Sequence, residues 1–224
     1  MSRSRMAVAG ALLVAAGAAH AGTEVSAAWV NDYDWRGVPQ SAGQSAVQLG
    51  ATFSAANGFY VGTWGSSLVS GSEIDAFLGF AGGDPQAAFG YDLGVNYYGY
   101  TNASEFNFYE AYAGISKGPL AAKLWYSPGL LGTDGSAFYL EGKATIALGA
   151  GFSLLAHVGY SLGDGVADTY GGDDHYLDWS AGFGYDVSHF STYLKYSDGG
   201  DNPASNKQFG RILFGISTTL PWSQ

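Results

Sequence analysis

The chain has 224 residues and a formal net charge of −10, with nine Lys and Arg residues against nineteen Asp and Glu residues. This acidic balance argues against nucleic-acid binding, because a phosphate backbone attracts basic surfaces. The sequence contains no cysteine, which excludes disulfides, a thiol nucleophile and a thiolate metal site. Charged residues make up only 12% of the chain while glycine fills 35 positions, a composition that disfavours a bundle of long helices.

The first residues have the pattern of a secretory signal peptide. Arg3 and Arg5 precede an uncharged stretch over residues 6–19, and small residues follow around Ala21. Cationic, apolar and small-residue regions in this order predict a signal peptide over residues 1–21. A short buried helix is the alternative interpretation. We therefore expect a single domain, residues 22–224, which leaves the cytoplasm.

The rest of the chain consists of segments of about ten residues in which apolar residues alternate with small, polar or charged ones. The first predicted strand runs from Val25 to Gly37, and the second, 46–55, is followed by Asn57-Gly58, a strong hairpin-turn signal. In chain order, the other predicted strands are 59–68, 73–81, 87–100, 107–116, 120–127, 138–148, 152–161, 177–185, 190–196 and 211–222. The pattern thus predicts about twelve strands.

The lengths of the connections between these strands alternate. Those after the even-numbered strands are short, whereas most of those after odd-numbered strands are longer, and the longest runs over residues 162–175. An even number of strands with short periplasmic turns and long extracellular loops is typical of bacterial outer-membrane barrels. The predicted fold is all-β, a transmembrane antiparallel up-and-down β-barrel of about twelve strands.

Alternation alone does not say which face of the strands points outward, because a soluble barrel or sandwich shows the same period. About twelve strands enclose a lumen too wide for one layer of Val, Leu and Ala to fill. Aromatic residues of the apolar face also gather near strand ends, as interfacial girdles do. We therefore expect the apolar face to contact outer-membrane lipid. The predicted girdle residues are Trp29, Trp35, Tyr97, Tyr126, Tyr160, Tyr185, Tyr196 and Trp222.

Several short motifs carry a resemblance to a known family. The segments 31–41 (NDYDWRGVPQS), 58–66 (GFYVGTWGS) and 73–75 (EID) resemble the TorF-type porins of Gram-negative outer membranes, long described only as a conserved proteobacterial family of unknown function. The later segments 94–98, 157–160 and 196–198 fit the same pattern. The resemblance implies an outer-membrane porin inserted by the barrel-assembly machinery. Such barrels end on an aromatic residue, whereas here Trp222 lies two positions before the end.

Charged residues of the polar face define a candidate constriction. With a periplasmic N-terminus, most of them fall at one height in the extracellular half, while Lys123 and Lys143 lie lower. Opposing charges around a lumen give porins their ion preference, and the acidic excess would favour cations. The alternative is that these charges pair and fill the lumen. The candidates are Arg36, Glu73, Asp75, Glu110, Lys123, Glu141, Lys143, Asp178, Lys195 and Arg211.

The predicted function is passive diffusion of small hydrophilic solutes or ions, without a cofactor, a bound metal or a catalytic residue. A closed barrel with a structural or surface-binding role is one alternative. A lipid-modifying enzyme is another, and would need a catalytic role for a residue such as His157. The acidic loop with Asp164, Asp168, Asp173 and Asp174 could supply oxygen ligands to Ca²⁺, but its spacing matches no EF-hand, and we interpret it as a solvated loop.

Overall fold

The computed structural model describes residues 21–200, 202 and 210–222. It is a closed antiparallel barrel in which each wall strand pairs with its neighbours in sequence and β1 pairs with both β4 and β14. The wall strands are β1 (Gly22–Val30), β4 (Ala46–Ser54), β5 (Phe59–Ser67), β6 (Ser72–Gly83), β7 (Gly90–Tyr100), β8 (Phe108–Lys117), β9 (Leu120–Ser127), β10 (Ala137–Gly149), β11 (Phe152–Leu162), β12 (His175–Val187), β13 (Phe190–Asp198) and β14 (Arg211–Leu220). The predicted twelve-stranded up-and-down barrel is confirmed.

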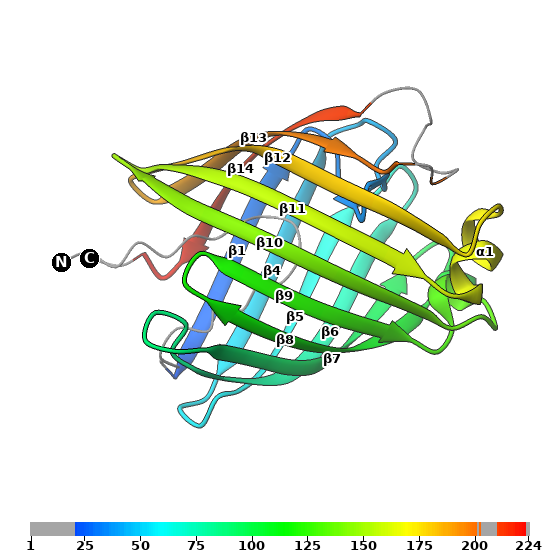
Figure 1. Ribbon diagram of the computed structural model, residues 1–224, viewed down its shortest axis with the longest axis horizontal. Helices are drawn as coiled ribbons and strands as arrows, with labels where there is room; N and C mark the ends of the chain where they lie inside the picture. The colour runs from blue at the N-terminus through cyan, green and yellow to red at the C-terminus, as the bar shows by residue number, and fades with distance from the viewer. Residues whose placement is uncertain (1–20, 201, 203–209, 223–224) are drawn as a thin grey trace.

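The two ends of the barrel differ in the way that the sequence predicts. Two-residue turns join β8 to β9, β10 to β11 and β12 to β13 at one end. The other end carries the longer connections, apart from the short one over residues 68–71 between β5 and β6, and it contains the short helices η1 (Ser104–Phe106), η2 (Leu130–Gly132) and α1 (Asp164–Tyr170). Figure 1 shows α1 at the end of the barrel opposite the start of β1 and the end of β14. We refer to these as the turn end and the loop end.

The alternation of each strand separates an apolar exterior from a polar interior. On β6, Glu73 and Asp75 are buried inside while Ile74 and Leu78 between and beyond them are exposed. Apolar side chains also face outward on the other wall strands, and Leu49 on β4, for example, is 59% exposed. Since a soluble barrel buries its apolar face, this distribution is that of a barrel surrounded by lipid. No helix among the described residues is long and apolar enough to span a membrane.

Replacing Val95 with Arg should destabilise the barrel by about 2–4 kcal/mol, because a charge would face hydrocarbon near the bilayer midplane. Val95 lies at the middle of β7 and is exposed on the outer wall. The measurement is the urea midpoint of the loss of heat-modifiable gel migration in lipid vesicles. Val187→Arg is the matched control, since Val187 ends β12 beside a short turn, where the cost should fall to about 0–1 kcal/mol. Equal costs at both positions would contradict the membrane orientation.

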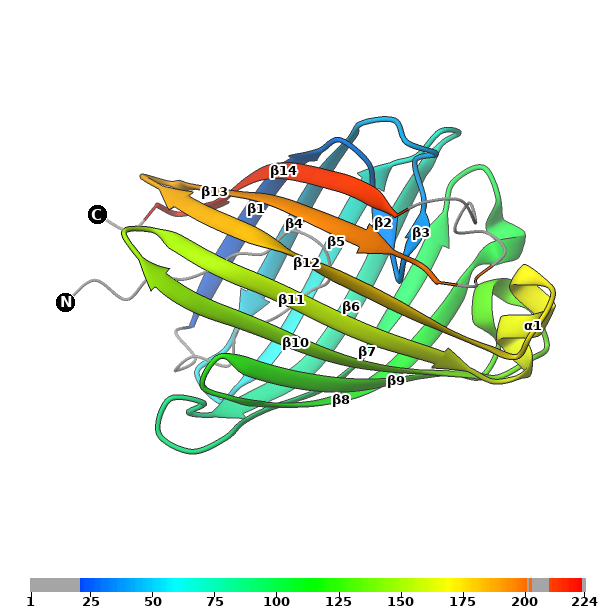
Figure 2. The ribbon, with the colours of Figure 1, turned by 45° about the horizontal axis from the view of Figure 1, so that its top comes forward.

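The first predicted strand is too long. β1 ends at Val30, and residues 31–45 leave the wall and fold into the barrel, where β2 (Asp34–Trp35) and β3 (Val38–Pro39) pair as a small hairpin. Figure 2 shows β2 and β3 beside the inner surface of the wall toward the loop end. Alternation continues through this segment of the sequence, so it gave no sign that the chain leaves the sheet. The predicted signal peptide lies outside the described residues except for Ala21.

Candidate functional site in the barrel lumen

The segment over residues 31–45, which we call the luminal hairpin, has its own polar framework. Ser41 Oγ donates to Asp32 Oδ1 over 2.9 Å, and the backbone N–H of Gly43 donates to the same oxygen over 3.1 Å. The backbone N–H of Tyr33 donates to Ser41 Oγ. The Asp32 carboxylate, 4% exposed, therefore holds the two arms of the hairpin together, which gives it a defined shape inside the barrel.

The tip of the luminal hairpin is locked to the far wall by Arg36. Its guanidinium donates to both carboxylate oxygens of Glu110 on β8, over 3.0 and 2.6 Å. The guanidinium carbon also lies 4.4 Å from the ring centroid of Trp35 and 4.2 Å from that of Tyr139. A bidentate pair enclosed by aromatic faces is the geometry that Arg uses best in buried sites. We call this contact the Arg36 lock.

The base of the luminal hairpin is tied to the opposite wall. Arg211, the first residue of β14, donates to Asp32 Oδ2 over 2.6 Å and also to Asp34 Oδ1. Ser197 Oγ on β13 donates to Asp34 Oδ2 over 3.0 Å. Together with the Arg36 lock, these bonds show that the hairpin crosses the lumen from β13 and β14 to β8. It therefore occupies part of the lumen.

A second group of charged contacts lies on the wall. Lys123 Nζ contacts Asp92 Oδ2 at 2.6 Å, and Tyr60 donates to the other oxygen of Asp92 over 2.5 Å. Lys143 Nζ lies 2.8 Å from Glu141 Oε2. Carboxylates and cations thus meet in pairs: the first pair reaches from β9 across β8 to β7, and the second lies within β10. These contacts place charge of both signs along the wall of the lumen.

His157 joins the wall charges on β10, β11 and β12. Its Nδ1 lies 3.4 Å from Asp178 Oδ1, and its Nε2 lies 3.6 Å from Glu141 Oε2 and 3.1 Å from the Tyr139 hydroxyl. Tyr139 also donates to Asp178. The imidazole is therefore a bridge between two carboxylates.

The structure places all ten predicted constriction residues inside the barrel, with one change of position. Arg36 lies at the tip of the luminal hairpin and not at the end of a wall strand, because the chain turns inward after Val30. Glu73 and Asp75 face the lumen from β6, with Tyr33 donating to Glu73 Oε1 over 3.2 Å. Lys195 faces the lumen from β13, and its Nζ lies 5.5 Å from the ring centroid of Tyr193.

Sequence reasoning missed several side chains that complete this network. Asp92 and Asn96 lie on the inward face of β7 and are 7% and 4% exposed. The alternation predicts that both side chains face inward. Only the contacts of Asp92 with Lys123 and of Asn96 with Asp75 show that they belong to the network. Asp32 and Asp34 also read as inward residues, yet their role depends on the inward fold of the hairpin. No local pattern could have paired them with Arg211, which is more than 170 residues away.

Seven of the eight predicted girdle residues are exposed on the outer wall, between 36% and 49%: Trp29, Tyr97, Tyr126, Tyr160, Tyr185, Tyr196 and Trp222. Trp35 is different, and its assignment to the girdle is wrong. Its ring packs inside the barrel against Tyr98 and Phe108, with centroids 6.2 and 6.1 Å away. The cause is again the departure of residues 31–45 from the wall.

The acidic loop over residues 163–174 contains α1. His175 Nδ1 lies 2.8 Å from Asp174 Oδ1, and this hydrogen bond lowers the pKa of the exposed Asp174 carboxyl. Within the ranges that the structure describes, there is no cluster of three or more His, Asp or Glu residues suited to hold a metal ion.

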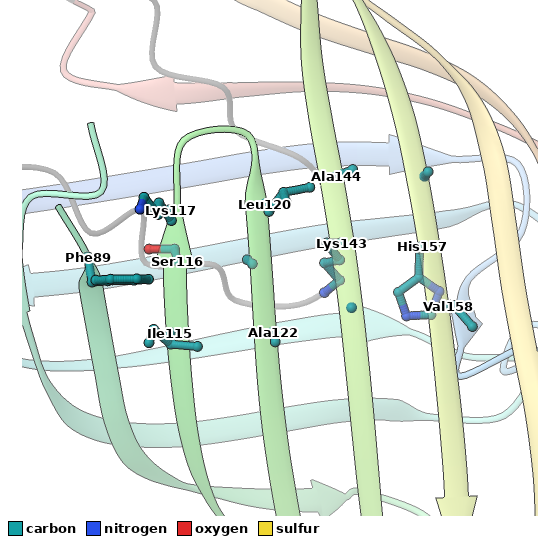
Figure 3. A pocket seen from close by; sticks show the side chains of 13 residues that line it. Phe89, Ile115, Ser116, Lys117, Leu120, Ala122, Lys143, Ala144, His157 and Val158 are labelled. Atoms are coloured by element: carbon teal, nitrogen blue, oxygen red, sulfur yellow. The ribbon is translucent and has the colours of Figure 1, made fainter. Parts of the chain in front are cut away.

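A shallow groove of about 530 Å³ lies on the barrel wall near the turn end. Figure 3 shows Lys117 and Leu120 on the two arms of the turn between β8 and β9, with Ala144 and Val158 on the next strands. The outward side chains at the groove are apolar: Phe89, Ile115, Leu120, Ala122, Ala144, Ala156 and Val158. Because it opens on the outer face, we do not assign it to the path through the lumen.

Known structures share this architecture. A structure titled "NanC porin structure in rhombohedral crystal form" superposes with a TM-score of 0.54 at 12% identity, covering 88% of this chain and 98% of that one. The KdgM porin gives 0.55 at 10% identity over 87% and 98% of the two chains. KdgM in complex with disordered oligogalacturonate gives 0.53 at 10% identity, covering 88% and 98%. At these identities the similarity establishes the fold, that of outer-membrane porins.

Among curated proteins, no sequence matches this chain. A bacterial family described as a protein of unknown function, Gcw_chp, matches residues 15–211. The match covers the luminal hairpin and the wall strands up to the first residue of β14. The chain therefore belongs to the Gcw_chp family.

Proposed function

We propose that this chain is an outer-membrane porin, a passive channel for small hydrophilic solutes or ions with a preference for cations. One observation carries the proposal. A closed wall with an apolar exterior surrounds an interior of charged side chains, and a hairpin narrows that interior to a constriction. Such an inside-out barrel suits a water-filled path across a membrane. The predicted signal peptide over residues 1–21 would direct export of the domain to the envelope and would then be removed.

The comparisons and the sequence motifs support the same class of protein. The similar barrels are titled porins, and one of them was determined with an oligogalacturonate. The resemblance of the luminal hairpin sequence to TorF-type porins points in the same direction. The solutes that we propose for this chain are small hydrophilic molecules or ions.

The distribution of charge in the lumen favours cations. Glu73, Asp75 and Glu110 lie on β6 and β8, whereas Lys143, Lys195 and Arg211 lie on β10, β13 and β14. Carboxylates also lie among these cations, since Glu141 contacts Lys143 and Asp34 contacts Arg211, and opposing charges around a pore give it an ion preference. Among the lumen residues described above, carboxylates outnumber cations, so the mean potential is negative and cations are enriched.

We expect the refolded protein to conduct in planar bilayers and to prefer K⁺ over Cl⁻. The double substitution Glu110→Lys and Glu141→Lys should shift the reversal potential in a KCl gradient toward anion preference, because it replaces two lumen carboxylates with cations beside Arg36 and Lys143. Asp84→Lys is the control, since Asp84 belongs to the turn between β6 and β7 and not to the lumen. Wild-type protein that folds without conducting would contradict the proposal, as would an unchanged reversal potential in the double variant.

A closed barrel with a structural or surface-binding role is the second candidate. The observation in its favour is the luminal hairpin itself, which is tied to both sides of the wall by ion pairs. Normal folding without single-channel events would favour this candidate. We further infer that the protein is not an enzyme, because the described hydrogen bond and ion-pair contacts of His157 join it to Tyr139, Glu141 and Asp178. Acyl transfer needs a base hydrogen-bonded to its nucleophile, and the described contacts do not join His157 to Ser180, which lies opposite it on β12.

A further inference from the structure

Two buried oxygen atoms on the lumen wall have no hydrogen-bond partner among the described residues, Oδ1 of Asp75 and Oδ1 of Asn96. Both side chains are only 4% exposed. They contact each other, because Asn96 Nδ2 donates to Asp75 Oδ2 over 3.1 Å, and this bond fixes which end of the amide faces the carboxylate. Two unsatisfied acceptors therefore lie in one place, where burial without a partner is costly and a water or an ion is the usual resolution.

The charge at this place distinguishes an ion from a water. Glu73 lies two residues from Asp75 on the same inward face of β6 and is 2% exposed. The neutral Tyr33 hydroxyl donates a hydrogen bond to its Oε1. The described ion pairs of the lumen with Lys or Arg use other carboxylates, namely Glu110, Asp92, Glu141, Asp32 and Asp34, and His157 contacts Asp178. A water satisfies a lone pair, whereas a bound cation also offsets two neighbouring negative charges in a confined space.

The surroundings suit a hard cation. Carboxylate and amide oxygens are the ligands that Na⁺, K⁺, Mg²⁺ and Ca²⁺ take in proteins. In register, Asp75 lies between Trp64 on β5 and Tyr98 on β7, and aromatic faces attract cations. We propose that Glu73, Asp75 and Asn96 form a cation-binding site on the lumen wall. The site deepens the proposed porin function and rests on it, since ions would reach it through the lumen.

Terbium luminescence tests the site directly in the full-length protein refolded in detergent, with Trp64 as a built-in sensitiser for Tb³⁺. Asp75→Asn should weaken Tb³⁺ binding roughly tenfold or more, because it removes one of two ligand charges. Glu73→Gln should act in the same direction. Asp186→Asn is the matched control, because this inward carboxylate near the turn end accepts from Ser191 and lies far from β6. Competition with Ca²⁺ and with K⁺ shows which charge of ion the site prefers.

Unchanged Tb³⁺ affinity in both Asp75→Asn and Glu73→Gln would overturn the proposal. So would an infrared carbonyl band of a protonated acid that disappears in Asp75→Asn, because a neutral carboxyl needs no cation. Heat-modifiable migration on gels verifies that each variant is folded. Asp75-dependent binding without bilayer conductance would uphold the site and refute the porin function, whereas conductance without Asp75-dependent binding would do the reverse.

Discussion

Replacing Arg36 with Ala should raise the single-channel conductance severalfold. Its guanidinium is the tip contact that holds the luminal hairpin across the lumen, and it satisfies both oxygens of Glu110. Without it, Glu110, 1% exposed, becomes a buried carboxylate with no cation. Breaking a buried pair in this way costs about 3–5 kcal/mol. The hairpin tip should therefore leave the wall, and the path through the barrel should widen.

Two further variants test whether the rise in conductance comes from loss of the Arg36 lock or from a general loss of stability. Arg36→Lys keeps the charge but not the planar fork, so we expect an intermediate conductance. Adding Glu110→Gln to Arg36→Ala should recover part of the free energy of unfolding, because the unpaired charge is removed, but it should not restore the low conductance, because the lock stays broken. A conductance of Arg36→Ala equal to that of the wild type would show that the hairpin does not limit the pore.

The wall of this barrel was predictable from sequence because most strands obey one rule with period two, although the two faces of the segment 59–68 are hard to rank from its residues. In the segment 46–55, for example, Val47, Leu49 and Phe53 mark the outer face, and the structure exposes all three. The short turns were equally visible, since hairpin turns depend on local residues. Closure of the barrel then follows, because an even number of antiparallel strands in lipid must pair their edges.

The constriction was less predictable, because it depends on contacts between distant segments. Residues 31–37 keep the alternation of a strand, yet Tyr33 and Trp35 are more favourable inside, where they meet Glu73 and Tyr98. The choice between wall and lumen rests on partners from β6, β7 and β14. The individual charges were identified, but the pairing of Arg36 with Glu110 was not, since it requires the path of the hairpin.

The close packing of Gly37 in the luminal hairpin gives a second large expected effect on conductance, and this effect involves no charged group. Gly37 follows Arg36 and has φ +79°, and a Cβ at this position would lie 2.5 Å from Gly199 Cα and 2.8 Å from Asp178 Cβ. Because neither neighbour is the end of a flexible side chain, Gly37→Ala should push the hairpin off β12 and raise conductance as Arg36→Ala does.

Gly43→Ala is the matched control for this substitution. Gly43 lies on the same hairpin with φ +77°, but a Cβ there has no atom within 4 Å. Both variants pay the backbone cost of an alanine in the left-handed region, about 1–2 kcal/mol, and only Gly37→Ala adds the clash. A rise in single-channel conductance in Gly37→Ala and not in Gly43→Ala would assign the effect to the seating of the hairpin. An equal rise above the wild-type conductance in both variants would show that backbone strain, and not contact with the wall, determines where the hairpin lies. Wild-type conductance in both would show that the seating of Gly37 does not limit the pore.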